Sequence, residues 1–477
     1  MDAKDLHRRM KVFFGLFIAL AAALSVGVLS APSKLQVPAK EIVGEVQQAQ
    51  NRRGSFYDAN GLLIASSEKG SPRRSYPDAL AFGSVIGYST GKKSGLEKKY
   101  NTVLTTASGK EPEGDSITLT LRTGIQTAIY DQLKKYRNAE AAIVVMNAKT
   151  GEVLGLGSAP ALNIAALPAD LSTLPNGSEY NNAAKSFVPG SVIKLVTSGA
   201  IVRQGLQDTE LYDTGEFIQD GWKKPIRNFG NAAYQATTLV SKSNIFKKQL
   251  TNGAIGKSIN TYFAKMAVEV LDPVGLDQMF SDFGLTDVSG AGAKPEALDL
   301  DFASISAQYS LKNENGVYTS FDLAQTAFGQ GRTLISPVHV SMITAAIANG
   351  GKLVKPYMIK HFQTPAGRTY KETRPSYIKK NLLSGAQCKI IQAGMKEAAQ
   401  GIGFSETSGL RCKTGSGEIT NNYNAIWITS YFEHEGELYV ITAFANKQPP
   451  KTLGRTWKDS ILAVRNAVAL SESKKNT

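Results

Sequence analysis

Two pairs of strand-like segments stand far apart in the chain and restrict its fold more than any other feature. The first pair, AAIVVM and EVLGLG, flanks the polar turn NAKTG at 147–151, and the second, NAIWITSYF and ELYVITAFAN, flanks the turn EHEG at 433–436. Runs rich in β-branched and aromatic residues around a polar turn are typical of β-hairpins. Apolar residues at helical spacing between the two pairs predict helices at 191–203, 258–271, 322–329, 336–349 and 384–400. Strands at both ends with helices between them predict one sheet assembled from distant segments, and hence an α+β domain.

The N-terminal segment is predicted to be a membrane anchor. Residues 12–31 carry no charge and are long enough to cross a bilayer as a helix. The basic residues just before this run are Lys4, Arg8, Arg9 and Lys11. Because basic flanks stay in the cytoplasm, we expect a cytoplasmic tail at 1–11 and one crossing of the cell membrane, with the rest of the chain extracytoplasmic. A cleaved signal peptide is the alternative, but the run is longer than a usual signal core.

The remaining chain divides into two parts and a tail. Residues 32–113 are polar and Gly-rich, and RRGSFYDANGLLIAS predicts two short strands around Asn60-Gly61, so we expect a small β-rich membrane-proximal module there. The main domain is predicted to begin at 114, where GDSITLTL alternates like a strand, and to end at 470. The charged end at 471–477 is predicted to be disordered.

Composition excludes several classes of function. The net charge of +14 suits an anionic partner, but the lysines are scattered and no recognition helix or aromatic-basic platform is present, so nucleic acid is not expected. Only four histidines occur, without a His-Glu-x-x-His motif, which argues against a zinc site or a Ser-His-Asp triad. Cys388 and Cys412 lack metal-site spacing, and they are either buried small residues or one disulfide.

Ser-x-x-Lys occurs five times, and one copy has a distinctive context. The copies begin at Ser66, Ser89, Ser191, Ser376 and Ser471. Only Ser191 follows a Pro-Gly turn and precedes an apolar helical run, VIKLVTSGAIV. Lys194 falls one turn later on the same helical face, where its amine can take the serine proton if burial lowers its pKa. A plain N-cap is the other interpretation of Ser191.

Two further short motifs follow in the chain. Ser258-Ile259-Asn260 precedes an apolar helical run, where Asn260 could equally be a structural cap. Lys-Thr-Gly occurs at 149–151, where turn chemistry explains it, and at 413–415, after a strand-like stretch. Glycine on a strand lets a ligand backbone approach closely, and lysine offers a positive charge to a carboxylate.

The order of the three motifs, at 191, 258 and 413, resembles that of the penicillin-binding transpeptidases and serine β-lactamases. The resemblance is to the class B, membrane-anchored kind without a glycosyltransferase domain, and it covers about 52–470. RRGSFYDANGLLIA is similar to the motif after that family's anchor, and AAIVVMNAKTGEVLGLGSAPALN to its first hairpin. The departures are Ser416, where the family commonly has Thr, Val192-Ile193 in place of Thr-Phe, and a short membrane-proximal module.

The resemblance implies a peptidoglycan D,D-transpeptidase with an antiparallel sheet flanked by helices and an all-helical subdomain. It implies that Ser191 attacks stem peptides ending in D-Ala-D-Ala, with Lys194 as base, and that β-lactams acylate the same serine. Ser258 would relay a proton, Asn260 would bond the substrate amide, and Lys413, Thr414 and Ser416 would hold the terminal carboxylate. Gly415 would belong to the substrate-binding residues with them. No cofactor or metal is implied, and a glycosyltransferase is a possible partner.

Two rival functions remain open at this point. One is a serine β-lactamase-like hydrolase or D,D-carboxypeptidase, although EVLDP from Glu269 lacks the Glu-x-x-x-Asn element of class A enzymes. The other is a non-catalytic penicillin-binding scaffold or sensor, against which the intact motifs argue.

Overall fold

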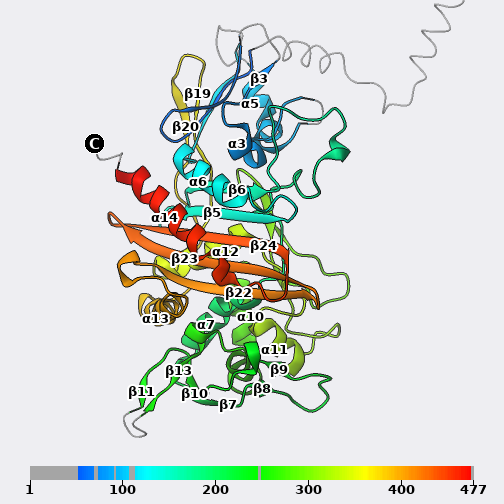
Figure 1. The fold of residues 1–477 in the computed structure, drawn as a ribbon, viewed down its shortest axis with the longest axis vertical. Helices are drawn as coiled ribbons and strands as arrows, with labels where there is room; N and C mark the ends of the chain where they lie inside the picture. Colours follow the sequence, from blue (N-terminus) through cyan, green and yellow to red (C-terminus); the bar gives the residue numbers. More distant parts are fainter. Residues whose placement is uncertain (1–51, 69–72, 91–92, 107–112, 245–248, 474–477) are drawn as a thin grey trace, which may run out of the picture.

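An antiparallel sheet of five strands occupies the middle of the molecule in the computed structural model, which describes residues 52–68, 73–90, 93–106, 113–244 and 249–473. Its strand order is β22 (Arg411–Thr420), β23 (Tyr423–His434), β24 (Glu437–Gln448), β5 (Ala141–Asn147) and β6 (Val153–Ala159). The two hairpins pair through β24 and β5, with Ile441 opposite Val145 (Figure 1). The prediction of one sheet from distant segments is therefore confirmed.

Helices cover both faces of this sheet. On one face, α6 (Thr123–Leu133) and α14 (Lys458–Ser473) share an apolar core with the sheet strands. On the other face lies α12 (Pro337–Ala348), all 12 residues of which are buried. The helix α13 (Gly385–Gly401) packs beside β22. Because α14 runs to Ser473, the first three residues of the tail that we expected to be disordered are helical.

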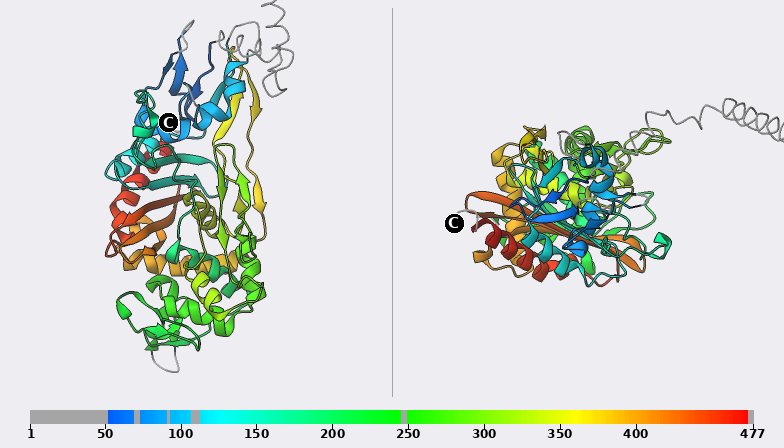
Figure 2. Two further views of the ribbon diagram at one scale, coloured as in Figure 1. Left: turned by 90° about the vertical axis from the view of Figure 1, so that its right-hand side faces the viewer. Right: turned by 90° about the horizontal axis from the view of Figure 1, so that it is seen from above.

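A second sheet of six strands lies at the N-terminal end of the described chain, at the top of Figure 1. Its order is β20 (Thr369–Glu372), β19 (Ile359–Gln363), β4 (Ser116–Leu119), β1 (Phe56–Tyr57), β2 (Leu63–Ser67) and β3 (Arg74–Ser75). The predicted turn at Asn60-Gly61 joins β1 to β2. The strand β4, with which we expected the main domain to begin, pairs with β1 and β19. Figure 2 shows the segment that carries β19 and β20 running up one side of the molecule to reach this sheet.

The opposite end of the molecule contains both helices and short strands, so the prediction of an all-helical subdomain is wrong. Its helices are α7 (Lys194–Arg203), α8 (Ala254–Lys257), α9 (Asn260–Lys265), α10 (Pro273–Asp282) and α11 (Ser320–Ala327). A small sheet accompanies them, formed by β7 (Leu211–Asp213), β10 (Gln235–Thr238) and β13 (Asn252–Gly253). A hairpin of β8 (Glu216–Phe217) and β9 (Ile226–Arg227) lies beside it. Strands of two to four residues are too short to produce a visible alternation in the sequence.

The predicted cytoplasmic tail at 1–11, the anchor at 12–31 and the first part of the module lie outside the described residues. Within the described ranges, none of the helices has the length and apolar character needed to cross a bilayer. Cys388 and Cys412 are both buried free thiols, and burial raises the pKa of each.

Candidate active site

Ser191 lies in a tight turn whose backbone is pressed against the edge strand β22. The 3-10 turn Gly190–Ile193 leads directly into α7. Gly190 has a φ of 53°, and a Cβ at this position would lie 2.5 Å from the carbonyl carbon of Ser416. Only glycine tolerates both the left-handed backbone and this approach. The helix caps are Pro189 and Ile193, so Ser191 is not an N-cap.

Ser191 is partly exposed, as a residue that meets a substrate must be. The segment before it is tied down by backbone bonds from Phe187 N to Ile335 O at 2.9 Å and from Gly190 N to Gly329 O at 3.0 Å. The Trp427 indole of β23 adds a bond to the carbonyl of Val188 at 2.9 Å. The serine is thus presented by a rigid turn, which favours a reactive role.

Lys194 is completely buried one turn after Ser191. Its Nζ donates to the carbonyl oxygen of Ser258 at 2.8 Å and to Oδ1 of Asn260 at 2.7 Å. Burial lowers the pKa of Lys194 well below its usual value, and the nearby charge of Lys413 lowers it further. The hydroxyl oxygen of Ser258 lies at 3.4 Å as a third contact of this amine, and in its neutral form the amine has a lone pair with which it can take a proton.

Ser258 interrupts the helix that the sequence predicts at 258–271. The helix α8 ends at Lys257, Ser258 adopts the left-handed conformation with φ 57° and ψ 45°, and α9 begins at Asn260. The segment then continues as a π-helical turn over Met266–Val270. A left-handed conformation is unfavourable for a residue other than glycine and is typical of functional positions. It places Ser258 Oγ 3.4 Å from the Nζ of Lys194.

Lys413 lies on β22 and completes this group. Its Nζ donates to Ser258 Oγ at 2.7 Å and to the carbonyl of Thr414 at 2.9 Å. The side chain is 1% exposed, and burial lowers its pKa to about 7. Strand alternation puts Thr414 and Ser416, both partly exposed, on the face opposite Lys413. The joint role of Lys413, Thr414 and Ser416 in holding a carboxylate stays a prediction.

A buried polar network behind Asn260 has no signal in the sequence. Asn260 donates through Nδ2 to the carbonyl of Arg227 at 2.8 Å. Asn228, which follows Arg227, and Thr261, which follows Asn260, also bond to each other: Asn228 Oδ1 accepts from Thr261 N at 3.1 Å. Asp213 accepts from Asn228 Nδ2 at 2.8 Å and from the Thr261 hydroxyl at 2.5 Å. These bonds fix the amide of Asn260 between Lys194 and the β8–β9 hairpin.

Four of the predicted catalytic residues thus form one hydrogen-bonded group, consisting of Lys194, Ser258, Asn260 and Lys413. Ser191 lies in the turn just before α7, and in the part of the chain that the structure describes its hydroxyl forms no bond to these four residues. An open serine beside a buried lysine of lowered pKa defines a site for acyl transfer through a serine ester.

Comparison with known families places this site in a particular class of enzyme. The model of the penicillin-binding protein transpeptidase domain matches residues 141–463. The chain therefore belongs to the penicillin-binding transpeptidase family, and the family and enzyme class predicted from the motif order are confirmed.

Relatives and solved structures agree with this assignment. The peptidoglycan D,D-transpeptidase PbpA of Mycolicibacterium smegmatis is 24% identical over 78% of this chain and 78% of its own length. Stage V sporulation protein D of Bacillus subtilis is 26% identical over 72% of this chain and 52% of its own length. The ceftriaxone acyl-enzyme complex of penicillin-binding protein A from Mycobacterium tuberculosis has a TM-score of 0.73 at 19% identity, covering 89% of this chain and 100% of its own. This structural likeness shows that the fold is shared.

Proposed function

We propose that the protein cross-links peptidoglycan stem peptides as a D,D-transpeptidase whose nucleophile is Ser191. The observation that carries this proposal is the environment of Lys194, which is fully buried one turn after Ser191, so that burial lowers its pKa and favours the neutral amine. The name of the mycobacterial relative, a peptidoglycan D,D-transpeptidase, supports the substrate class.

The first half-reaction forms an ester on Ser191. The Ser191 oxygen attacks the carbonyl carbon of the penultimate D-alanine while its proton passes to Nζ of Lys194. The proton then moves through the hydroxyl of Ser258 to the nitrogen of the terminal D-alanine, and the C–N bond breaks. Lys413 stabilises the oxygen of Ser258 during this transfer through its 2.7 Å bond. Free D-alanine leaves, and Lys194 is neutral again.

The second half-reaction reverses these proton transfers with a new amine. An amino group of a neighbouring stem peptide attacks the ester carbonyl and loses a proton to Lys194. The Ser191 oxygen regains a proton as the ester bond breaks, and a new amide bond is the cross-link. The backbone N–H groups of Ser191 and Ser416 would bind the developing oxyanion in both steps, a role worth about 10²–10³ in rate for one donor.

Substrate recognition falls to the exposed face of β22. The hydroxyls of Thr414 and Ser416 lie on the same face of the strand and are partly exposed, so they can hold the terminal carboxylate. Gly415 allows the strand to lie close to the Ser191 turn, since a Cβ there would lie 2.9 Å from Pro189 O. Asn260 would bond the substrate amide when the substrate displaces one of its present partners.

β-Lactams are proposed to acylate the same serine. Penicillin-binding protein A of Mycobacterium tuberculosis has been solved as acyl-enzyme complexes with ceftriaxone, imipenem and penicillin G. An amide in a strained ring presents its carbonyl as the peptide does, and its amine stays attached after the ring opens.

The proposed location follows from the sequence alone. We propose that residues 12–31 anchor the chain in the cell membrane, with 1–11 in the cytoplasm and residues 114–470 extracytoplasmic as the transpeptidase domain. A wall-synthesis glycosyltransferase is the proposed partner in the membrane. Protease added to intact protoplasts should then remove nearly all of the chain after residue 35, and protection of the large domain would contradict this topology.

The function is tested with a stem pentapeptide ending in D-Ala-D-Ala and an added acceptor amine. Mass spectrometry should find free D-alanine and a peptide joined to the acceptor, and Ser191→Ala should abolish both products. Ser66→Ala, in an accidental copy of the motif, is the matched control and should retain activity. Release of D-alanine with only the water product would favour the hydrolase or carboxypeptidase, and no release at all would favour the scaffold.

A further inference from the structure

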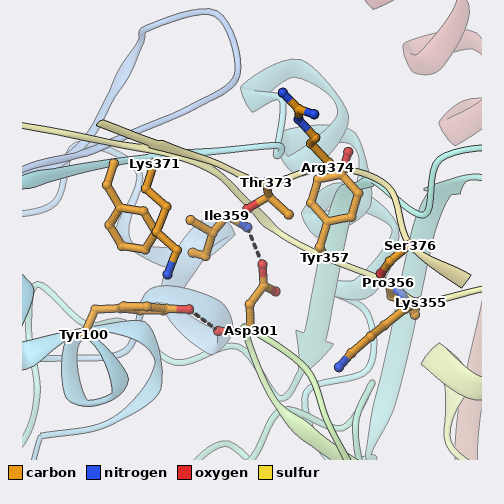
Figure 3. Close-up of a pocket in the computed structure, with 11 residues that line it drawn as sticks. Tyr100, Asp301, Lys355, Pro356, Tyr357, Ile359, Lys371, Thr373, Arg374 and Ser376 are labelled. Carbon is orange, nitrogen blue, oxygen red and sulfur yellow. Dashed lines mark hydrogen bonds between the residues drawn. The ribbon is translucent and has the colours of Figure 1, made fainter. Parts of the chain in front are cut away.

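A cavity lies away from the motif residues, where the six-stranded sheet meets the segment that follows α12. Its volume is about 270 Å3, and its walls come from the end of α4 (Gly95–Lys99), the loop at 301, β19 and the strand β20 with the loop after it. Figure 3 shows this cavity, with Tyr100 at one end and Lys355 at the other. None of the residues of the three motifs lines it.

Three cations line this cavity, and one of them, Lys355, lies close enough to Asp301 to interact with its charge. Within the described ranges, Lys355, Lys371 and Arg374 form no salt bridge. The amine of Lys371 lies 5.3 Å from the centre of the Phe362 ring, and Figure 3 shows the amines of Lys371 and Lys355 on opposite sides of Asp301. Three cations around a cavity with one carboxylate create a positive potential inside it.

The single carboxylate in the wall is already engaged by backbone groups. The oxygens of Asp301 accept from Met358 N at 2.9 and 3.0 Å and from Ile359 N at 2.8 Å. Burial also raises the pKa of Asp301, which disfavours its charged form. A fourth cation, Lys99, bonds the carbonyl of Leu300 at 2.6 Å beside it. The cavity therefore keeps a positive surplus whether or not Asp301 is ionised.

Other nearby carboxylates do not cancel this surplus. Glu372 follows Lys371 in β20, where strand alternation points the two side chains to opposite faces. Glu152 accepts from the Tyr357 hydroxyl at 3.3 Å and does not line the cavity. Thr373 and Ser376 add hydroxyl groups to the wall, and the tilted pair of Tyr100 and Phe362, with ring centres 5.7 Å apart, adds an apolar surface.

We propose that this cavity is a binding site for a phosphate ester. Several cations and hydroxyl donors suit a phosphate, which carries more charge and more acceptor oxygens than a single carboxylate. The aromatic pair suits the organic group that the phosphate carries. The volume is slightly below the range of about 300–1,000 Å3 for sites that enclose a whole small molecule, so the site fits one phosphorylated end of a larger chain. That chain is either a lipid, through its headgroup, or a water-soluble phosphate ester such as a unit of a wall polymer.

Lysine acetylation in the full chain, held in phosphatidylcholine nanodiscs, tests this proposal. A short pulse of acetic anhydride is applied with and without glycerol 3-phosphate at constant ionic strength, and peptide mass spectrometry reads each lysine. Bound phosphate should slow acetylation of Lys355 and Lys371 severalfold. The exposed lysines Lys135 and Lys389 are internal controls and should react at an unchanged rate. In a second arm, phosphatidylglycerol in the nanodisc replaces the soluble ester.

Each outcome decides the matter. Protection by glycerol 3-phosphate supports a soluble phosphate ester, and protection only in phosphatidylglycerol nanodiscs supports a lipid headgroup. Arg374→Gln should raise the half-protecting concentration about tenfold, the usual effect of losing one charged hydrogen bond. Equal slowing at Lys135 and Lys389, or no protection in either arm, would overturn the proposal. Because Arg374 lies outside the catalytic group, penicillin labelling of Arg374→Gln confirms that the variant is folded.

Discussion

Replacing Lys413 with methionine should stabilise the protein at neutral pH while it removes activity. Burial lowers the pKa of Lys413 from 10.5 to about 7. The unfolded state therefore binds more protons than the folded state between about pH 7 and pH 10.5, and stability rises with pH across this window. At about 1.36 kcal/mol for each pKa unit, the cost of burying this lysine is about 4 kcal/mol at pH 7 and falls to about 1 kcal/mol at pH 10.

Methionine keeps the length of the side chain and removes the charge. It also loses the bonds to Ser258 and Thr414, which contribute about 1 kcal/mol each. The variant Lys413→Met should then be about 2 kcal/mol more stable than the wild type at pH 7 and about 1 kcal/mol less stable at pH 10. Thermal or urea unfolding at both pH values measures this difference, and penicillin labelling measures the expected loss of acylation.

The difference in stability between Lys413→Met and the wild type, compared at pH 7 and pH 10, reports the titration of Lys413, because the other titrating groups are the same in both proteins. Lys389→Met, at an exposed position, should differ from the wild type by the same small amount at pH 7 and pH 10. A Lys413→Met protein that is less stable than the wild type by an equal amount at both pH values would refute the reasoning. It would mean that Lys413 is charged and well stabilised in the folded protein.

Three further predictions concern the geometry of the site. Gly190→Ala should lower the free energy of unfolding by about 2–4 kcal/mol and abolish penicillin labelling, because the added methyl group would meet the backbone of Ser416. Thermal unfolding measures the first effect, and labelling with fluorescent penicillin measures the second. Asp213→Ala should slow acylation by at least about tenfold, because the partners of Asp213 no longer fix the amide that contacts Lys194, and stopped-flow labelling checks this. The acylation rate should rise with pH through the lowered pKa of Lys194, since only its neutral amine accepts the proton. A rate that falls as the pH rises through this pKa would contradict its role as base.

The sequence predicted most of the catalytic residues because their motifs are local. Ser191 and Lys194 are three residues apart on one turn, and the final hairpin marks the place of Lys413 on a strand. The order of the motifs carried the family assignment, although Ser-x-x-Lys and Lys-Thr-Gly also occur by accident elsewhere in the chain.

What the sequence could not predict depends on pairing between distant segments. The alternation at 114–121 indicates a strand, but it does not reveal that β4 pairs with β1 and β19. The helical period at 258–271 hides one left-handed residue, Ser258, because a single reversal of φ leaves the apolar spacing intact. Asp213 belongs to a network with partners 15 and 48 residues away, so no short motif contains it.

Intact-mass spectrometry after a short pulse of penicillin G tests the central claim most directly, namely that Ser191 is the acyl-accepting serine of a transferase. The wild-type chain should gain the mass of one penicilloyl group, peptide mapping should place it on Ser191, and it should persist for many minutes after free drug is removed. The sequence from Glu269 lacks the Glu-x-x-x-Asn element of class A β-lactamases, whose glutamate activates water against this ester. An adduct on Ser191→Ala, or loss of the wild-type adduct within seconds together with steady turnover of a chromogenic cephalosporin, would contradict the claim.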